Sequence, residues 1–310
     1  MWWITDGFFQ TTPSQAVLVI SVRSLVRTLL LIPCGEVAVY SSPRKSMMRK
    51  RIAFALKVGS AALLAIVALV GHAFWRASSG PNNTHRRLGT IPRLVLWAWE
   101  EPEDLRFVDT GHVGVAYLAS TVNLSGNKAS IRPRFQRLLV PDDAKLIAVV
   151  RIEAGQDATL DSRQRDAVVR NVVALSSLPR VSAVQIDFDA TKSQRAFYQD
   201  VLVHLRNALP PSMPISITAL ASWCMGDNWI ASLPIDEAVP MLFRLGAGTN
   251  EVATWLASGR DFSAPICRDS LGVSTDEPWT KLPAGRRIYV FRTKPWTAQA
   301  QLALSWELPR

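Results

Sequence analysis

Short apolar runs alternate with segments of helical periodicity along residues 92–310, and this alternation constrains the fold more than any other feature. An apolar run between helical segments is typical of a parallel strand buried on both faces. Eight strands are predicted, at Leu94–Trp99, Val113–Leu118, Leu146–Ile152, Ala183–Asp187, Ile215–Leu220, Glu237–Phe243, Leu271–Val273 and Ile288–Phe291. Eight parallel strands in about 220 residues predict a compact (β/α)8 TIM-like barrel whose first helices are degraded. The alternative is a doubly wound open sheet, although the chain has no GxGxxG or P-loop motif.

Helical periodicity and capping residues predict the elements between the strands. Asp161 is a predicted N-cap for a helix over Ser162–Ser176. A second helix, Ser193–Leu209, ends at Pro210 and Pro211 because proline lacks the amide donor. The shorter predicted elements are helices at Asn250–Ala257 and Thr297–Leu304 and a hairpin at Thr121–Arg132.

A basic segment and an uncharged apolar stretch precede the predicted barrel. The stretch Val58–Trp75 ends at Arg76 and follows the basic residues Arg44, Lys45, Arg49, Lys50 and Arg51. About eighteen apolar residues are near the lower limit for a membrane span, and the basic flank places that side in the cytoplasm. The pattern predicts a signal anchor or a cleaved signal peptide. A buried soluble helix is the remaining alternative, which the basic flank disfavours.

This region divides the chain into four parts. Met47 and Met48 precede Arg-Lys-Arg, which resembles the start of an export signal, so residues 1–46 are interpreted as an over-extended N-terminus or as a cytoplasmic tail. Residues 47–76 are the signal segment, 77–91 a linker rich in Ser, Gly, Pro and Asn, and 92–310 the barrel. Both kinds of signal predict a periplasmic barrel, either anchored in the inner membrane or released by cleavage.

The positive charge lies in the targeting region. Residues 1–90 hold 11 Lys and Arg against 2 Asp and Glu, whereas residues 91–310 hold 24 against 23. A nucleic-acid-binding domain carries its basic patch on the folded part. The sequence therefore predicts a membrane partner through residues 58–75 and no nucleic-acid partner.

Cys224 and Cys267 are the only cysteines of the predicted barrel, and Cys34 lies in the N-terminal region. In an oxidising compartment the barrel pair predicts a single disulfide, the alternative being two unrelated buried residues. Because there is no CxxC and no His/Cys cluster, neither a metal site nor a cofactor is predicted.

Three carboxylates end predicted strands and are the candidate catalytic residues. Asp187 ends an apolar run, Asp189 follows two residues later on the same side, and Glu153 ends the strand before them. The carboxyl ends of barrel strands carry active sites, and glycoside hydrolysis requires two carboxyl groups. The alternatives are a buried structural role for Asp187 and a salt bridge from Glu153 to Arg151 or Arg244.

Aromatic and basic residues near the same strand ends are typical of a sugar site. Tryptophan offers a flat apolar face and one donor, which suits stacking on a pyranose ring, and arginine binds carboxylates and anionic sugars. The candidate substrate-binding residues are Trp99, Glu100, Trp223, Arg244, Arg268 and Trp296. For any single tryptophan, packing in the core is the alternative.

Four segments resemble a bacterial family of exported proteins, the domain of unknown function 3142. They are Gln185–Thr191, Ile215–Cys224, Asp236–Arg244 and Cys267–Gly272, and the similarity extends over most of residues 92–310. The resemblance implies a glycosidase-like barrel and an export signal, and it implies no particular reaction.

The strand around Asp187 also resembles the family-18 chitinase signature, Asp-x-x-Asp-x-Asp-x-Glu. Asp187 and Asp189 match its second and third acids, but Val184 replaces the first and Thr191 the proton-donating Glu. The sequence therefore leaves three functions open. One is a glycan hydrolase or transglycosidase of the cell envelope, with Glu153 as the acid. Another is a non-catalytic glycan-binding or envelope-assembly protein on the same fold, and the third is a purely structural envelope protein.

Overall fold

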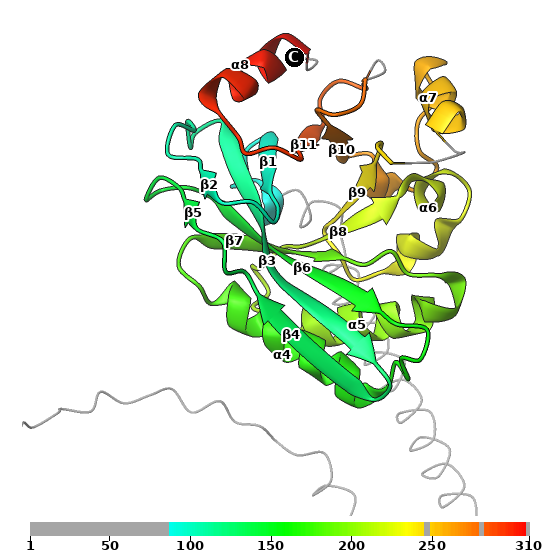
Figure 1. Ribbon diagram of the computed structural model, residues 1–310. Helices are drawn as coiled ribbons and strands as arrows, with labels where there is room; N and C mark the ends of the chain where they lie inside the picture. Colours follow the sequence, from blue (N-terminus) through cyan, green and yellow to red (C-terminus); the bar gives the residue numbers. More distant parts are fainter. Residues whose placement is uncertain (1–86, 245–248, 279–281, 308–310) are drawn as a thin grey trace, which may run out of the picture. The chain divides into compact units, whose positions relative to one another are not determined.

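The computed structural model describes residues 87–244, 249–278 and 282–307 (Figure 1). Within these three ranges, no helix is long and apolar enough to cross a membrane. The predicted anchor at residues 58–75, the predicted start at Met47 or Met48 and most of the predicted linker lie outside the described residues.

Eight parallel strands form a closed barrel in the order β1-β11-β10-β9-β8-β7-β6-β3. Closure comes from β1, which pairs in parallel with both β11 and β3. This double pairing confirms the predicted barrel and excludes the open sheet. The strands are β1 (Leu94–Ala98), β3 (Val113–Ser125), β6 (Leu146–Ala154), β7 (Val181–Asp187), β8 (Ile215–Leu220), β9 (Glu237–Met241), β10 (Ser270–Ser274) and β11 (Arg287–Phe291).

Each barrel strand overlaps a predicted strand, and the largest difference is at β3, which extends to Ser125. The extension pairs with β4 (Lys128–Pro133) as the predicted antiparallel hairpin. This hairpin and a small sheet of β2 (Glu103–Asp104) with β5 (Leu138–Leu139) occupy the connections between β1 and β6, where no helix forms. The first helices of the barrel are therefore absent, as the sequence predicts.

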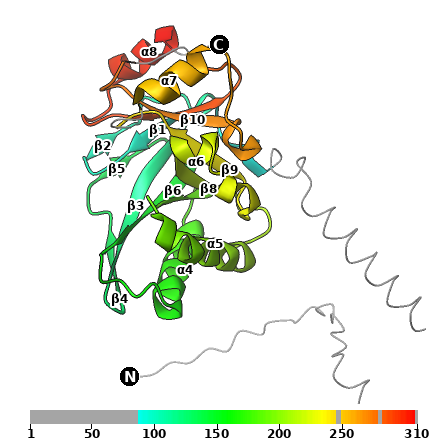
Figure 2. The same cartoon turned by 90° about the vertical axis from the view of Figure 1, so that its right-hand side faces the viewer.

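Helices follow the later strands. They are α4 (Ser162–Ser176), α5 (Arg195–Ala208), α6 (Ala221–Met225), α7 (Thr249–Ala257) and α8 (Ala298–Glu307), with short 3-10 turns at Lys192–Gln194, Asn228–Ser232 and Pro265–Cys267. Asp161 caps α4 as predicted, since its Oδ1 accepts from the amides of Arg163 and Gln164 at 2.9 and 3.0 Å. Figure 2 shows α4 and α5 side by side, well separated from α7 and α8.

Side chains of alternate strand residues point to opposite sides of the barrel wall, so two cores form. The outer core lies between the strands and the helices and includes Ile186, Ile217 and Val201. The inner core fills the barrel and includes Val95, Val149 and Val239, together with several aromatic rings. The barrel interior is thus packed below the level at which the strands end.

The segment just before β1 closes the amino-terminal end of the barrel. Leu88 and Ile91 are buried in the inner core, although the sequence analysis places them in the linker. Arg87 forms an ion pair with the buried carboxylate of Asp236 at 2.7 Å. Arg287 donates to the carbonyl oxygens of Leu88 and Ile91 at 3.1 and 3.4 Å. The folded unit therefore begins at or before Arg87.

The predicted disulfide is present between Cys224 and Cys267, with the Cα atoms 5.9 Å apart. It joins α6, which follows β8, to the 3-10 turn before β10. Both sulfur atoms are buried in the outer core. The bond therefore ties together two connections on one side of the barrel.

Removing the disulfide should lower the free energy of unfolding by about 3–4 kcal/mol, because the bond closes a loop of 43 residues in the unfolded chain. The Cys224→Ala/Cys267→Ala variant tests this by urea unfolding under oxidising conditions, with Cys34→Ala as the matched control. Equal stability of the double variant and the native chain would contradict the expectation.

Candidate functional site

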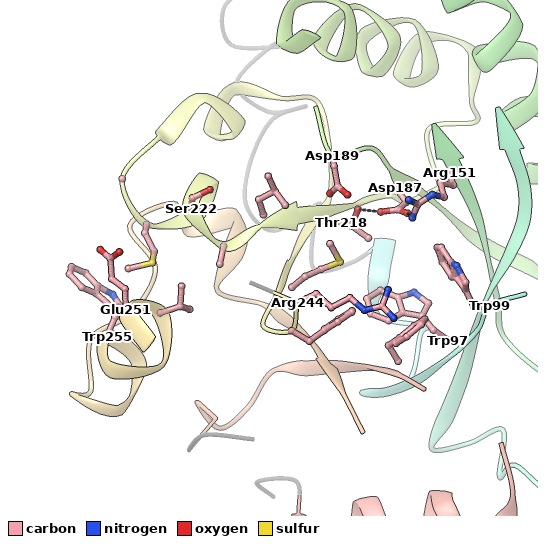
Figure 3. Close-up of a pocket in the computed structure, with 18 residues that line it drawn as sticks. Trp97, Trp99, Arg151, Asp187, Asp189, Thr218, Ser222, Arg244, Glu251 and Trp255 are labelled. Carbon is pink, nitrogen blue, oxygen red and sulfur yellow. Dashed lines mark hydrogen bonds and ion pairs between the residues drawn. The ribbon is translucent and has the colours of Figure 1, made fainter. Parts of the chain in front are cut away.

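A cavity of about 680 Å³ lies where the barrel strands end (Figure 3). Its lining includes Asp187 at the end of β7, Leu220 at the end of β8 and Phe291 at the end of β11. The carboxyl ends of parallel strands are where barrel folds place binding sites. The cavity is therefore the candidate functional site.

Four aromatic side chains form the floor and one wall of this cavity: Trp97, Trp99, Phe243 and Phe291. The rings of Phe243 and Phe291 are stacked with centroids 5.4 Å apart. Trp99 meets Phe291 edge to face at 6.1 Å, and Trp97 meets Phe243 at 6.3 Å. The four rings hold one another in place and give this part of the cavity an aromatic lining.

Asp187 is buried at the top of the barrel and is fully engaged. Its Oδ1 accepts a hydrogen bond from Thr218 at 2.7 Å, and its Oδ2 accepts from Arg151 at 3.1 Å. Arg151 and Asp187 are directly paired across β6 and β7, so the strand register itself brings the charges together. Because both of its oxygens are bonded, the Asp187 carboxylate holds the side chains of Thr218 and Arg151 in place.

Burial raises the pKa of the Asp187 carboxyl above its ordinary value. The hydrogen bond from Thr218 and the charge of Arg151 oppose this rise, while the negative charge of Asp189 adds to it. Any ligand that places positive charge or a hydrogen-bond donor beside Asp189 would relieve the repulsion between the two carboxylates.

Asp189 is exposed and lines the cavity next to Asp187. In Figure 3 its carboxylate stands above Thr218, free of the dashed lines that join Asp187 to its partners. It forms no hydrogen bond or ion pair with any residue in the three described ranges. Asp189 is therefore the carboxylate that remains available to an occupant.

Glu153, the predicted acid, lies outside the cavity lining. Its Oε1 accepts from Nε of Arg151 at 2.9 Å, while Arg151 also reaches Asp187 and lies over the Trp99 ring at 5.9 Å. This is the salt bridge that the sequence analysis left open. Arg151 thus bridges Glu153 and Asp187, but only the two aspartates line the cavity.

Arg244 lines the cavity from the turn after β9. Its backbone has a left-handed φ of 54°, which is uncommon for a residue other than glycine. The carboxylate of Glu277 stabilises this turn by accepting from the Arg244 amide at 2.9 Å. The guanidinium lies 5.4 Å from the centroid of the Phe291 ring. The turn thus directs a cation over the aromatic wall.

Glu251 and Trp255 line the cavity from α7, and the sequence analysis did not single them out. They are four residues apart, so they share one face of the helix. The spacing of four residues predicts that the two side chains lie together on the helix, but it does not indicate which face of α7 packs against the barrel. Figure 3 shows the pair at the opposite side of the cavity from Trp99 and Asp187, so the cavity is elongated.

The remaining predicted residues lie outside the lining. Trp223 is buried and packs edge to face on Trp229 at 5.0 Å, and the buried Trp296 donates to the Trp97 carbonyl at 3.0 Å. Glu100 pairs with Arg132 at 3.0 Å on the surface. Arg268 donates to the carbonyl oxygen of Phe262 at 2.8 Å. Trp223 and Trp296 therefore pack in the core, which was the alternative to a role in sugar binding.

No group of three or more His, Cys, Asp or Glu side chains that could hold a metal ion occurs within the part of the chain that the structure describes. What the cavity does offer is an aromatic lining, one unpaired carboxylate beside a buried one, and a guanidinium. This combination can hold a polar ligand with apolar faces.

Comparison with known proteins identifies the central part of the barrel. Residues 142–242 match the family model of the domain of unknown function DUF3142, which confirms the predicted resemblance over this range. The range runs from before β6 to just after β9 and contains both aspartates. No curated protein matches the sequence. Among solved structures, a chitinase from Rhizomucor miehei is similar at 14% identity, covering 59% of this chain and 68% of its own, with a TM-score of 0.37.

Asp187 should make stability depend on pH in a defined direction. A carboxyl whose pKa is raised on folding contributes stability below its unfolded pKa of about 3.9, and this contribution is lost as pH rises through the folded pKa. Asp187→Asn cannot titrate. Its free energy of unfolding relative to the native chain should therefore increase as the pH rises above the unfolded pKa of about 3.9.

Urea unfolding at several pH values measures this difference. Asp142→Asn, which removes an exposed carboxylate elsewhere, is the matched control. A difference that stays constant or falls with pH would contradict the assignment.

Proposed function

We propose that the cavity binds a chain of sugar residues, and that the protein is an exported, glycosidase-like barrel that holds polysaccharide of the cell envelope. The observation that carries the proposal is the elongated cavity with a tryptophan at each end, Trp99 and Trp255, and an unpaired carboxylate, Asp189.

Sugar rings have an apolar face and a rim of hydroxyl groups. The apolar face stacks on tryptophan, and the hydroxyls donate to carboxylates, which accept strongly. In this cavity the half-buried Trp99 offers the stacking surface, and Asp189 accepts with no competing partner among the described residues. An elongated cavity of about 680 Å³ accommodates more than one ring.

Hydrolysis or transglycosylation is the second candidate, favoured by the neighbouring carboxyl groups of Asp187 and Asp189. Glycoside cleavage needs one carboxyl group that holds a proton and one that is ionised. The raised pKa of Asp187 is in the direction that a proton donor requires. Binding remains the preferred function because Thr218 and Arg151 already hold Asp187, and Thr191 stands where the chitinase signature has its proton donor.

Export is part of the proposal. Disulfides persist in oxidising compartments, and the bond between Cys224 and Cys267 fits a periplasmic location. Residues 58–75 would then act as the inner-membrane anchor or as a cleaved signal. A C-terminal reporter that is active only outside the cytoplasm tests this, and a fusion that is produced at full length but is inactive would reject it.

Trp99→Ala should weaken binding of the preferred oligosaccharide roughly tenfold, because it removes one stacking surface. Isothermal calorimetry with neutral, uronate-containing and amino-sugar oligosaccharides identifies the ligand and measures the loss. Phe135→Ala, which removes a ring that is 79% exposed and outside the cavity lining, is the matched control. Equal losses in the two variants would contradict the proposed site.

Asp189→Asn separates the two candidate functions. If the protein only binds glycan, the native chain releases no shorter product from any polysaccharide in the panel, and the variant loses affinity alone. If it is a hydrolase, chromatography detects products with the native chain, and the variant slows their release at least about a hundredfold. Asp142→Asn should match the native chain in both measurements.

A further inference from the structure

Five buried side chains form a polar path inside the barrel, beneath the cavity. The path begins at Trp97 on the cavity floor, whose indole Nε1 donates to Oε1 of Gln185 at 3.0 Å. Nε2 of Gln185 donates to the hydroxyl of Ser216 at 3.0 Å, and that hydroxyl donates to Oε2 of Glu237 at 2.9 Å. The path thus runs from β1 across the barrel to β7, β8 and β9.

A second arm returns from Glu237 to Trp97. The hydroxyl of Tyr289 on β11 donates to Oε2 of Glu237 at 2.7 Å, and the Tyr289 ring lies 5.3 Å from the Trp97 ring. Gln185, Ser216, Glu237 and Tyr289 have no solvent exposure, and Trp97 is 2% exposed. The indole is therefore held at its nitrogen by one arm and on its ring by the other.

The direction of donation along this path is fixed by chemistry. An indole nitrogen only donates and a carboxylate only accepts. Arg287, which donates to Oε1 of Glu237 at 2.5 Å, provides the charge that keeps this carboxylate paired. With both ends fixed, the amide of Gln185 and the hydroxyl of Ser216 have one orientation each that satisfies every group. A rotated indole would leave a buried donor without a partner, which is costly.

A glycine on β10, Gly272, makes room for the Trp97 indole because it has no side chain. Gly272 is the cross-strand neighbour of Tyr289. A Cβ atom at this position would lie 3.1 Å from Cη2 of Trp97, closer than ordinary contact. The absence of a side chain at Gly272, the hydrogen bond from the indole to Gln185 and the contact with the Tyr289 ring thus all favour one position of the Trp97 ring.

We infer that Gln185 is a positioning residue for the cavity floor: through the path to Glu237 it fixes the nearly buried Trp97 ring, which supports the aromatic lining beneath the proposed glycan site. The inference rests on the proposed function for its consequence in binding. The fixed indole itself can be measured without any ligand.

Gln185→Met tests the inference in the full chain, because methionine preserves volume and removes both hydrogen bonds. Hydrogen exchange of the Trp97 indole proton, identified by its absence in Trp97→Phe, should accelerate roughly threefold to tenfold. Affinity for the preferred oligosaccharide should fall by a similar factor. Gln164→Met is the matched control, since Gln164 is equally buried and donates to two carbonyl oxygens of the β3–β4 hairpin.

A double-variant cycle distinguishes positioning from a general loss of structure. In the Trp97→Phe background, Gln185→Met should change affinity by less than about twofold, because the indole through which it acts is gone. The same loss in both backgrounds, or unchanged exchange of the Trp97 proton, would overturn the inference. If the native chain binds no glycan, the proposed function fails, while the exchange measurement still decides the position of Trp97.

Ser216→Ala provides a milder variant in case Gln185→Met does not fold. It removes the hydroxyl that joins Gln185 to Glu237 and keeps the Tyr289 ring on Trp97. Faster exchange of the Trp97 indole proton supports the inference, and exchange equal to that of the native chain opposes it.

Discussion

The ion pair between Arg287 and Glu237 is the contact on which both ends of the barrel depend. Above it, Glu237 accepts from Ser216 and Tyr289 and so supports the floor of the cavity. Below it, Arg287 donates to carbonyl oxygens of the segment that precedes β1. A charge taken out of water must be paired and hydrogen-bonded, and here each additional bond also orders a different part of the inner core.

Most of the barrel could be predicted from the sequence because a strand that is buried on both faces consists mainly of apolar residues. Each barrel strand is an apolar run, and Asp161 with the periodicity of Ser162–Ser176 defines α4 to the residue. The closure of the sheet is different, since it depends on the pairing of β1 with β3 and β11, which no single segment encodes. The count of eight strands was the only signal for it.

The candidate site was predicted in part, for reasons that particular residues make clear. Asp187 ends an apolar strand and Asp189 follows two residues later, so the alternation of side chains along a strand places both on the same side. Both line the cavity. Glu153 obeys the same rule, but it is bonded to Arg151, which also holds Asp187, and it does not line the cavity. Trp223 follows β8 directly, yet α6 begins at Ala221 and turns its ring into the core. Side-chain partners and helix faces are set by tertiary contacts, so local spacing does not determine them.

The β3–β4 hairpin gives this barrel something that closure otherwise abolishes, a free edge. Among the residues that the structure describes, β4 pairs with β3 on one side only, and such an edge is a template for pairing with another chain. Its sequence carries Lys128 and Arg132, which repel a second copy, and ends in Pro133, which lacks an amide donor. These two charges and the proline therefore disfavour pairing of this edge with a strand of another copy.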